Sequence, residues 1–331
     1  MLADSLLLVA GLVILVRGGD LFVSAAVRTA GFLRVPHIVI GSTLVSLATT
    51  TPELSVSVMA GASNAPGLAV GNAVGSCICN IGLILGLGAV IRSIEINRRT
   101  ILVPLAAMVA SGVVLFLLTL DLSLSRRQGA CLVAAGVGYF GWDLWRHIRH
   151  ARRSESAQAV ALEANLAPPA ARWAWFATRT GTAVQFVASA LLVVLGSRLL
   201  VGGAIGLAAA IGIPPIVVGL TVVAAGTSLP ELVTAITSAR QAVSELSVGN
   251  VIGANIANLT LVVGAAACLQ DIRLDRSMQL FNFPAALVFM LALAVLALWR
   301  RRIGRGSGAA LIAGYAIYVA ALLAVSGLPA G

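Results

Sequence analysis

Long apolar runs, most of them bounded by a turn signal or an arginine cluster, recur along the whole chain. A helix of about 20 apolar residues is long enough to cross a lipid bilayer. The pattern predicts ten transmembrane helices, at about 3–28, 36–62, 67–90, 100–120, 126–147, 178–204, 214–239, 244–268, 278–299 and 307–327. The main polar stretch divides them into two units of five helices, 1–147 and 178–331, joined by a basic cytoplasmic linker at 148–177.

Composition excludes a soluble protein. The chain is 59% hydrophobic and 10% charged, with a mean hydropathy of +1.01, whereas soluble domains carry roughly a quarter charged residues. The net charge of +10 comes from arginines alone. In a membrane protein this charge favours contact with anionic lipids of the cytoplasmic leaflet rather than with nucleic acid.

Arginines in the loops predict the orientation, because cytoplasmic loops are enriched in basic residues. With the N-terminus outside, the inner loops hold sixteen arginines and the outer loops four. We therefore expect a multi-pass protein of the cell inner (plasma) membrane, with its N-terminus outside and its central basic loop in the cytoplasm.

An internal repeat relates the two halves at an offset of 178 positions. The matching pairs are Pro36/Pro214, Pro52/Pro230, Glu53/Glu231, Gly71/Gly249, Asn72/Asn250, Gly75/Gly253 and Asn80/Asn258. Five helices separate each helix from its counterpart, and because five is odd the copies must cross the membrane in opposite directions. The predicted fold is all-α, with ten transmembrane helices in two inverted five-helix repeats and proline-broken helices at the midplane. Secondary transporters have this architecture, and bind their substrate between the copies.

Each copy places a proline directly before a glutamate inside an apolar segment, at Pro52–Glu53 and Pro230–Glu231. Proline removes a backbone hydrogen bond and opens the helix. A charged carboxylate at the centre of a membrane helix costs about 2.5–3.5 kcal/mol on insertion scales. Since the sequence offers no basic residue at the same depth, a bound cation is the natural counter-charge. One such pair would also fit a simple kink with its glutamate facing a water pocket, but two copies in register favour a binding site.

Polar neighbours are predicted to lie on the same face as the glutamates. They are Thr49, Thr50, Asn72, Ser76 and Asn80 in the first copy, and Thr227, Ser228, Asn250 and Asn258 in the second. Carboxylate, carbonyl and amide oxygens are the ligands of hard cations. The Gly-xxx-Gly pairs in both copies predict close packing of that helix against a neighbour.

The two segments, at about 36–91 and 214–268, resemble the alpha repeats of the cation/calcium antiporters, in particular the bacterial sodium/calcium exchanger group. In that family a G-T-S-x-P-E stretch precedes G-N-x-x-G-S-x-x-x-N/D. The second copy matches the first stretch fully, at Gly226, Thr227, Ser228, Pro230 and Glu231. The first copy is looser but keeps the threonine, the proline and the acid.

This resemblance implies a role for each matching residue. Glu53 and Glu231 would be shared calcium ligands, and Asn80 and Asn258 would complete the centre. The remaining ligands implied are the carbonyl oxygens of Thr49 and Thr227 and, for flanking sodium sites, Thr50, Ser228, Ser76 and the backbone near Ser46 and Ala224. The resemblance also implies alternating access, in which the long first helices of the two halves slide against the site-bearing core. We expect no cofactor beyond the transported ions, Ca²⁺ and Na⁺ or H⁺. The expected partners are inorganic cations and membrane lipids, with no obligate protein partner.

Two residues depart from the family pattern. Asn258 stands where sodium/calcium exchangers usually have aspartate, and Ala254 stands where a serine hydroxyl is expected at a sodium site. The expected function is a secondary antiporter that exchanges Ca²⁺ for Na⁺. The alternative is a proton-coupled antiporter of Ca²⁺ or another cation, because burial disfavours charged carboxylates and lets protons compete at Glu53 and Glu231.

Two other classes of function fit the sequence less well. An intramembrane hydrolase is disfavoured because HExxH, GxGD and Ser/Lys motifs are absent from the sequence. A channel would gain little from a closed cage with two acids, since conduction requires weak binding. We therefore expect a transporter and not an enzyme.

Overall fold

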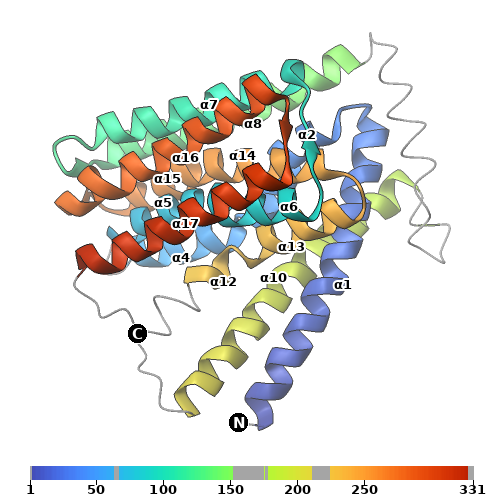
Figure 1. Ribbon diagram of the computed structural model, residues 1–331, viewed down its shortest axis with the longest axis horizontal. Coiled ribbons are helices and arrows are strands. Elements are labelled where there is room, and N and C mark those ends of the chain that lie inside the picture. The colour runs from blue at the N-terminus through green and yellow to red at the C-terminus, as the bar shows by residue number, and fades with distance from the viewer. Residues whose placement is uncertain (1, 63–66, 152–174, 176–177, 211–223, 327–331) are drawn as a thin grey trace.

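The computed structural model describes residues 2–62, 67–151, 175, 178–210 and 224–326. Most of the predicted linker and the first ten residues of the predicted seventh helix lie outside the described residues. Nearly all of the described chain is helical (Figure 1).

The α-helices are, in chain order, α1 Leu2–Leu33, α2 His37–Ile40, α3 Ser46–Thr49, α4 Thr51–Ala62, α5 Gly67–Cys79, α6 Gly86–Ile91, α7 Arg98–Leu118, α8 Arg126–Ala151, α10 Arg179–Ala210, α12 Ala224–Thr227, α13 Leu229–Arg240, α14 Ser244–Ala257, α15 Val263–Leu269, α16 Phe283–Val295 and α17 Arg305–Ser326. Turns of π-helix continue several of them, namely η1 Gly41–Val45, η2 Asn80–Leu85, η5 Asn258–Val262, η6 Met278–Asn282 and η7 Leu296–Arg300. The four short strands are β1 Ile94–Glu95, β2 Ser123–Leu124, β3 Ile272–Arg273 and β4 Arg302–Ile303.

Seven helical segments in the described part of the chain are long and apolar enough to cross a membrane. They are Leu2–Leu33, Ala69–Ile91, Arg98–Leu118, Arg179–Gly203, Ser244–Leu269, Met278–Arg300 and Arg305–Leu322. These coincide with seven of the ten predicted spans. The predicted fifth span is the unbroken 26-residue helix α8, which lies outside this set. The predicted second and seventh spans are interrupted helices.

The interruptions fall at Thr50 and Ser228, two residues before each proline. Thr50 has φ −78° and ψ 1°, and Ser228 has φ −90° and ψ 8°, so neither continues an α-helix. Each proline then occupies the first turn of a new helix, where its missing N–H is harmless. As a result Glu53 and Glu231 lie in the first turns of α4 and α13.

Helices α1 and α10 run side by side and diverge from the other helices at one end (Figure 1). Glycines let their backbones approach closely: a Cβ atom on Gly11 would meet the backbone of Leu200, and one on Gly196 would meet the backbone of Leu15. Because α1 and α10 pack mainly against each other and less against the other helices, they form a distinct structural unit.

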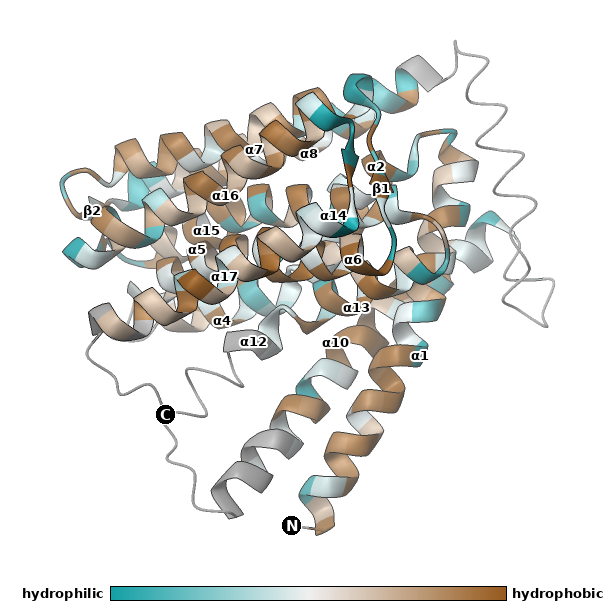
Figure 2. Cartoon of the chain, in the orientation of Figure 1, coloured by the Kyte–Doolittle hydropathy of each residue, from teal (hydrophilic) through white to brown (hydrophobic). Residues whose placement is uncertain are grey.

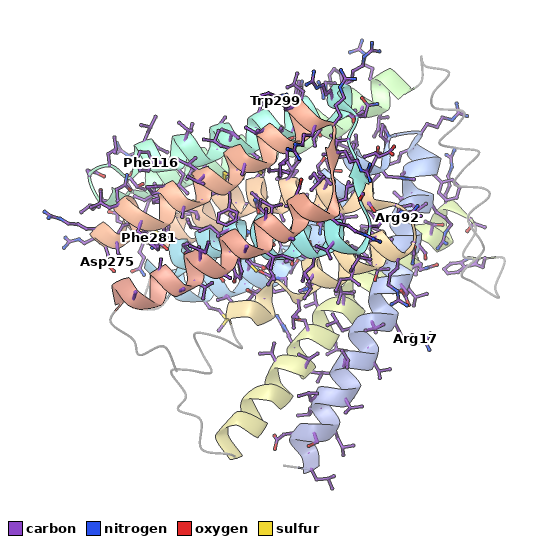
Figure 3. The ribbon with its side chains drawn as sticks, viewed as in Figure 1. Arg17, Arg92, Phe116, Asp275, Phe281 and Trp299 are labelled. Carbon is purple, nitrogen blue, oxygen red and sulfur yellow. The ribbon has the colours of Figure 1, made fainter. Side chains whose placement is uncertain are left out.

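Helix α14 lies at the centre of the remaining bundle. It packs against α2, η1, α3, α13 and α7, and every residue from Leu246 to Ala257 is buried. Peripheral helices instead expose apolar side chains, such as Leu12 on α1 and Val288 on α16, and hydrophobic residues colour much of both helices brown in Figure 2. Trp299, 81% exposed, stands at the outer end of η7, and Arg17 projects from α1 away from the bundle (Figure 3). An apolar exterior around a buried polar helix is the arrangement expected in lipid.

The four strands form two antiparallel pairs that join the halves of the chain. β1 pairs with β4 through Ile94 and Ile303, and β2 pairs with β3 through Leu124 and Ile272. Since Ile272 lies 178 positions after Ile94, β1 and β3 are equivalent under the repeat. Each half therefore contributes one strand to each pair.

The prediction for the Gly-xxx-Gly pairs is correct in the second copy and wrong in the first. A Cβ on Gly249 would meet the Ile38 carbonyl of α2, and one on Gly253 would meet the Ser42 carbonyl of η1. In α5, Gly71 has only the end of a methionine side chain nearby, and Gly75 has no heavy atom within 4 Å of its ideal Cβ. Of the two helices, α14 occupies the crowded centre, so its Gly-xxx-Gly pair, and not that of α5, is needed for close approach.

We predict that Gly253→Ala destabilises the protein by about 1–3 kcal/mol, the usual effect of overpacking a tight core. Gly75→Ala, the matched change in the first copy, should be neutral or slightly stabilising, since alanine favours a helix by about 1 kcal/mol over glycine. Thermal unfolding of the purified proteins in detergent measures both. Equal unfolding temperatures for the two variants would contradict this account of the packing.

Candidate functional site

Glu53 and Glu231 are buried where the two interrupted helices face each other; each is 1% exposed. Each carboxylate accepts a hydrogen bond from the other copy of the repeat. Ser228 Oγ donates to Glu53 Oε1 at 3.1 Å, and Thr50 Oγ1 donates to Glu231 Oε1 at 3.5 Å, a long hydrogen bond. Since Thr50 and Ser228 are themselves equivalent under the repeat, the exchange is reciprocal.

Four side-chain oxygens on α4, α13 and the π-helical turns packed against them, η5 and η2, are buried and have no hydrogen-bond partner among the described residues. They are Glu53 Oε2, Glu231 Oε2, Asn80 Oδ1 and Asn258 Oδ1. Within the same residues neither glutamate forms a salt bridge. An unpartnered buried polar group is costly, and a buried charge more so. A cation bound among these oxygens would remove that cost.

Asn80 and Asn258 each open a turn of π-helix, η2 and η5. Both are buried, at 1% and 0% exposure. Turns of π-helix are rare and are often found at functional sites, because the extra residue changes the direction in which side chains project. The sequence did not predict these turns.

The flanking residues differ between the two copies. Ser76 is buried, with 5% of its surface exposed, and its Oγ lies 3.4 Å from Ser228 Oγ. Its counterpart Ala254 is fully buried and offers no hydroxyl. The pseudo-symmetric arrangement therefore has one more oxygen on one side than on the other.

The structure accounts for the other predicted site residues as follows. Thr49 Oγ1 donates to Asn250 Oδ1 at 3.1 Å, and Ser46 Oγ donates to the Thr43 carbonyl at 3.0 Å. Thr227, 8% exposed, ends α12, and Ala224 begins it. The side chain of Ala224 lies outside the described part of the structure.

Sequence reasoning missed Asn255. This residue is fully buried on α14, and its Oδ1 accepts a hydrogen bond of 3.0 Å from Asn80 Nδ2. Its counterpart under the repeat is Cys77 and not a second asparagine. A position-by-position comparison of the two copies therefore does not single out Asn255. An asparagine within an apolar stretch was the available signal.

The donor set consists of oxygens, which suits hard cations such as Ca²⁺ and Na⁺. In the described residues no group of three or more His, Cys, Asp or Glu side chains could hold a metal ion. Two carboxylates balance the charge of one divalent cation, and neutral oxygens can supply the other ligands, so a third acidic side chain is not required. Such a site suits an ion that is bound and released again.

Residues 4–142 and 181–324 match the family described as sodium/calcium exchanger protein. The chain is therefore a membrane antiporter rather than an enzyme. More particularly, it belongs to the sodium/calcium exchanger protein family, as the resemblance of its two repeats implied.

Relatives of full length support this membership. The inner membrane protein YrbG of Escherichia coli is 34% identical, over 97% of both chains. The sodium/calcium exchanger MaX1 of Methanosarcina acetivorans is 29% identical, over 96% of this chain and 97% of its own. Among solved structures, the sodium-calcium exchanger NCX_Mj soaked with Na⁺ and Ca²⁺ is 30% identical, with a TM-score of 0.80 over 96% of this chain and 98% of that one.

We predict that Ca²⁺ stabilises the folded protein, because it would occupy the oxygens that lack partners. At a hundredfold excess over its Kd, a ligand of the native state adds about 2.7 kcal/mol. The double variant Glu53→Gln/Glu231→Gln should lose this stabilisation, yet be at least as stable as the wild type without Ca²⁺, since neutral amides are easier to bury than charges. Thermal unfolding with and without Ca²⁺ measures both effects.

Glu95→Gln is the control for this experiment, because Glu95 is exposed on β1 and remote in sequence from the site. It should keep the full response to Ca²⁺. An unchanged response in the double variant would place the bound ion elsewhere.

Proposed function

We propose that this protein exchanges Ca²⁺ for Na⁺ across a membrane by alternating access, with Ca²⁺ bound at the midplane between Glu53 and Glu231. The observation that carries the proposal is the set of four buried oxygens without hydrogen-bond partners, two of them on carboxylates held by crossed hydrogen bonds. Two carboxylates balance the charge of one Ca²⁺. When the ion leaves, their charges need replacement by Na⁺ or by protons, which couples the two fluxes.

The proposed roles follow the family pattern residue by residue. Glu53 and Glu231 bind Ca²⁺, Asn80 and Asn258 complete its coordination, and Thr49 and Thr227 contribute backbone carbonyls. The flanking sodium sites use Thr50, Ser228, Ser76 and the backbone near Ser46 and Ala224. Burial of all those whose side chains are described supports this assignment.

We further propose ten transmembrane helices in two inverted repeats, 1–147 and 178–331, with 148–177 as the linker. The strand pairs support this count. In a ten-helix layout the turns with β1 and β4 face one side of the membrane, and the turns with β2 and β3 face the other. If the number of transmembrane helices between two paired strands were one more or one fewer, the two strands would lie on opposite sides of the membrane and could not pair.

The charges near these strands support an N-terminus outside and the linker in the cytoplasm. Arg92, Arg302 and Arg305 line a cavity beside β1 and β4, whereas the four arginines near β2 and β3 are interspersed with Asp121, Asp271 and Asp275. Arg92 and Asp275 lie toward opposite ends of the bundle in Figure 3. The basic side is the cytoplasmic one by the positive-inside rule. YrbG is named as an inner membrane protein, and we propose the same location here.

The pair of α1 and α10 is the proposed moving part. Polar contacts of α1 to the core occur at the end of α13, where Gln241 Nε2 donates to the Asp20 carbonyl at 3.3 Å. On α10, Ser197 Oγ donates to the carbonyl of Gly226 beside the site at 2.8 Å. We expect the pair to slide across its contact with α13 and α2, while the helices that carry the glutamates stay packed around α14.

A proton-coupled exchanger is the second candidate, and one observation favours it. Ala254 is buried at the position equivalent to Ser76, so one flanking hydroxyl is missing, and Asn258 removes an ionisable group from the centre. Protons on Glu53 and Glu231 would then replace sodium ions as the exchanged charge.

Uptake of radioactive Ca²⁺ into proteoliposomes tests the proposal. We expect an outward Na⁺ gradient to drive uptake, and Glu53→Gln and Glu231→Gln each to abolish it, because a single carboxylate leaves the ion with a net positive charge. If only an outward H⁺ gradient drives uptake, the coupling ion is the proton and not Na⁺. Failure of both gradients would refute Ca²⁺ exchange.

A further inference from the structure

Asn255 connects three groups at the centre of the molecule. Its Oδ1 accepts from Asn80 Nδ2 at 3.0 Å, and its Nδ2 lies 3.4 Å from the carbonyl oxygen of Cys77 and 3.7 Å from Met108 Sδ. Asn255 is fully buried, so water does not substitute for any of these partners. The remaining atom of the Asn80 amide, its Oδ1, has no partner among the described residues.

These contacts determine which way both amides face. A backbone carbonyl can only accept a hydrogen bond, so the Asn255 amide must direct its NH₂ group at Cys77. Its oxygen then faces Asn80, and an oxygen there can accept only from the NH₂ group of Asn80. The oxygen of Asn80 is consequently left for the cation. Without Asn255, the Asn80 amide could rotate by 180° and present its NH₂ group, which repels a cation.

We infer that Asn255 is a positioning residue that fixes the amide of Asn80 with its oxygen toward the transported cation. This inference rests on the proposed binding of Ca²⁺ beside Glu53 and Glu231. Outer residues of this kind typically change metal affinity by about 10–100-fold when they are altered.

The equivalent position in the other half carries a thiol in place of the amide. Cys77 occupies the place of Asn255 under the repeat, and its Sγ lies 3.8 Å from the Asn255 carbonyl. Asn258, the counterpart of Asn80, has neither amide atom hydrogen-bonded within the described residues. Asn80 therefore has an amide to orient it, whereas Asn258 has only the weak contact with the thiol of Cys77.

Asn255→Cys is the sharpest test, because the chain already carries a cysteine at the equivalent position. Calorimetric titration of the purified full chain with Ca²⁺, in sodium-free detergent buffer with reductant, should show affinity about tenfold weaker than wild type. In Ca²⁺ uptake, KM should rise by a similar factor while kcat stays within about twofold, since the change affects binding of the ground state. Asn255→Ser makes the same prediction if the cysteine variant unfolds.

Asn80→Asp in the Asn255→Cys background separates orientation from packing. A carboxylate has oxygen at both ends, so it needs no partner to orient it, and Asn255→Cys should no longer weaken Ca²⁺ binding when it is compared with Asn80→Asp alone. Packing damage at Asn255 would weaken binding in both backgrounds. Wild-type affinity in Asn255→Cys, or an equal loss of affinity in both backgrounds, would overturn the inference.

Glu53→Gln distinguishes failure of this inference from failure of the proposed function. If Glu53→Gln abolishes Ca²⁺ binding and Asn255→Cys leaves it unchanged, the proposed function stands and the role of Asn255 is refuted. If Glu53→Gln binds Ca²⁺ as tightly as the wild type, the site itself is wrong, and the inference is overturned with it.

Discussion

Two carboxylates buried side by side without a basic partner are the constraint on which the rest of this structure depends. Neither Glu53 nor Glu231 forms a salt bridge within the described residues, and both are almost fully removed from solvent. The fold reduces the cost of this arrangement locally. Each helix stops before its proline and starts again, so that each glutamate lies in the first turn of a helix. There unpaired N–H groups and the helix dipole favour negative charge, and the hydroxyl of the opposite copy completes the support.

The internal repeat explains how one motif serves both sides of the site, and the differences between its copies explain where the halves differ. Thr50 and Ser228 exchange hydrogen bonds with the glutamates of the opposite copy, which a single copy could not do. The symmetry ends at the next helix. Under the repeat Ser76 corresponds to Ala254, which has no hydroxyl, and Cys77 corresponds to Asn255, so the two halves do not offer the same polar groups. In the proposed exchanger this asymmetry would give a two-acid site distinct places for unlike ions.

Periodicity and the 178-residue offset were sufficient to predict seven of the helices and the pairing of Glu53 with Glu231, because both follow from local pattern and repetition. The rest depended on tertiary packing. Gly75 and Gly253 occupy the same place in the motif, yet only Gly253 is crowded, since α14 alone runs through the centre. The π-helical turns at Asn80 and Asn258 have no sequence signal that distinguishes them from α-helix. Proline was expected to open each helix, and in the structure it also lies in the first turn of the helix that carries each glutamate.

The most direct test of this account is a crystal structure of the protein soaked with Sr²⁺, a heavier substitute for Ca²⁺, with its position taken from anomalous scattering. The account predicts one peak between α4 and α13, at about 2.3–2.6 Å from oxygens of both Glu53 and Glu231, the range of calcium–oxygen ligands; slightly longer distances are expected for the larger ion. The oxygens of Asn80 and Asn258 should complete its coordination. A peak elsewhere in the bundle, or none at saturating Sr²⁺, would contradict the claim that the two buried carboxylates exist to hold a transported cation.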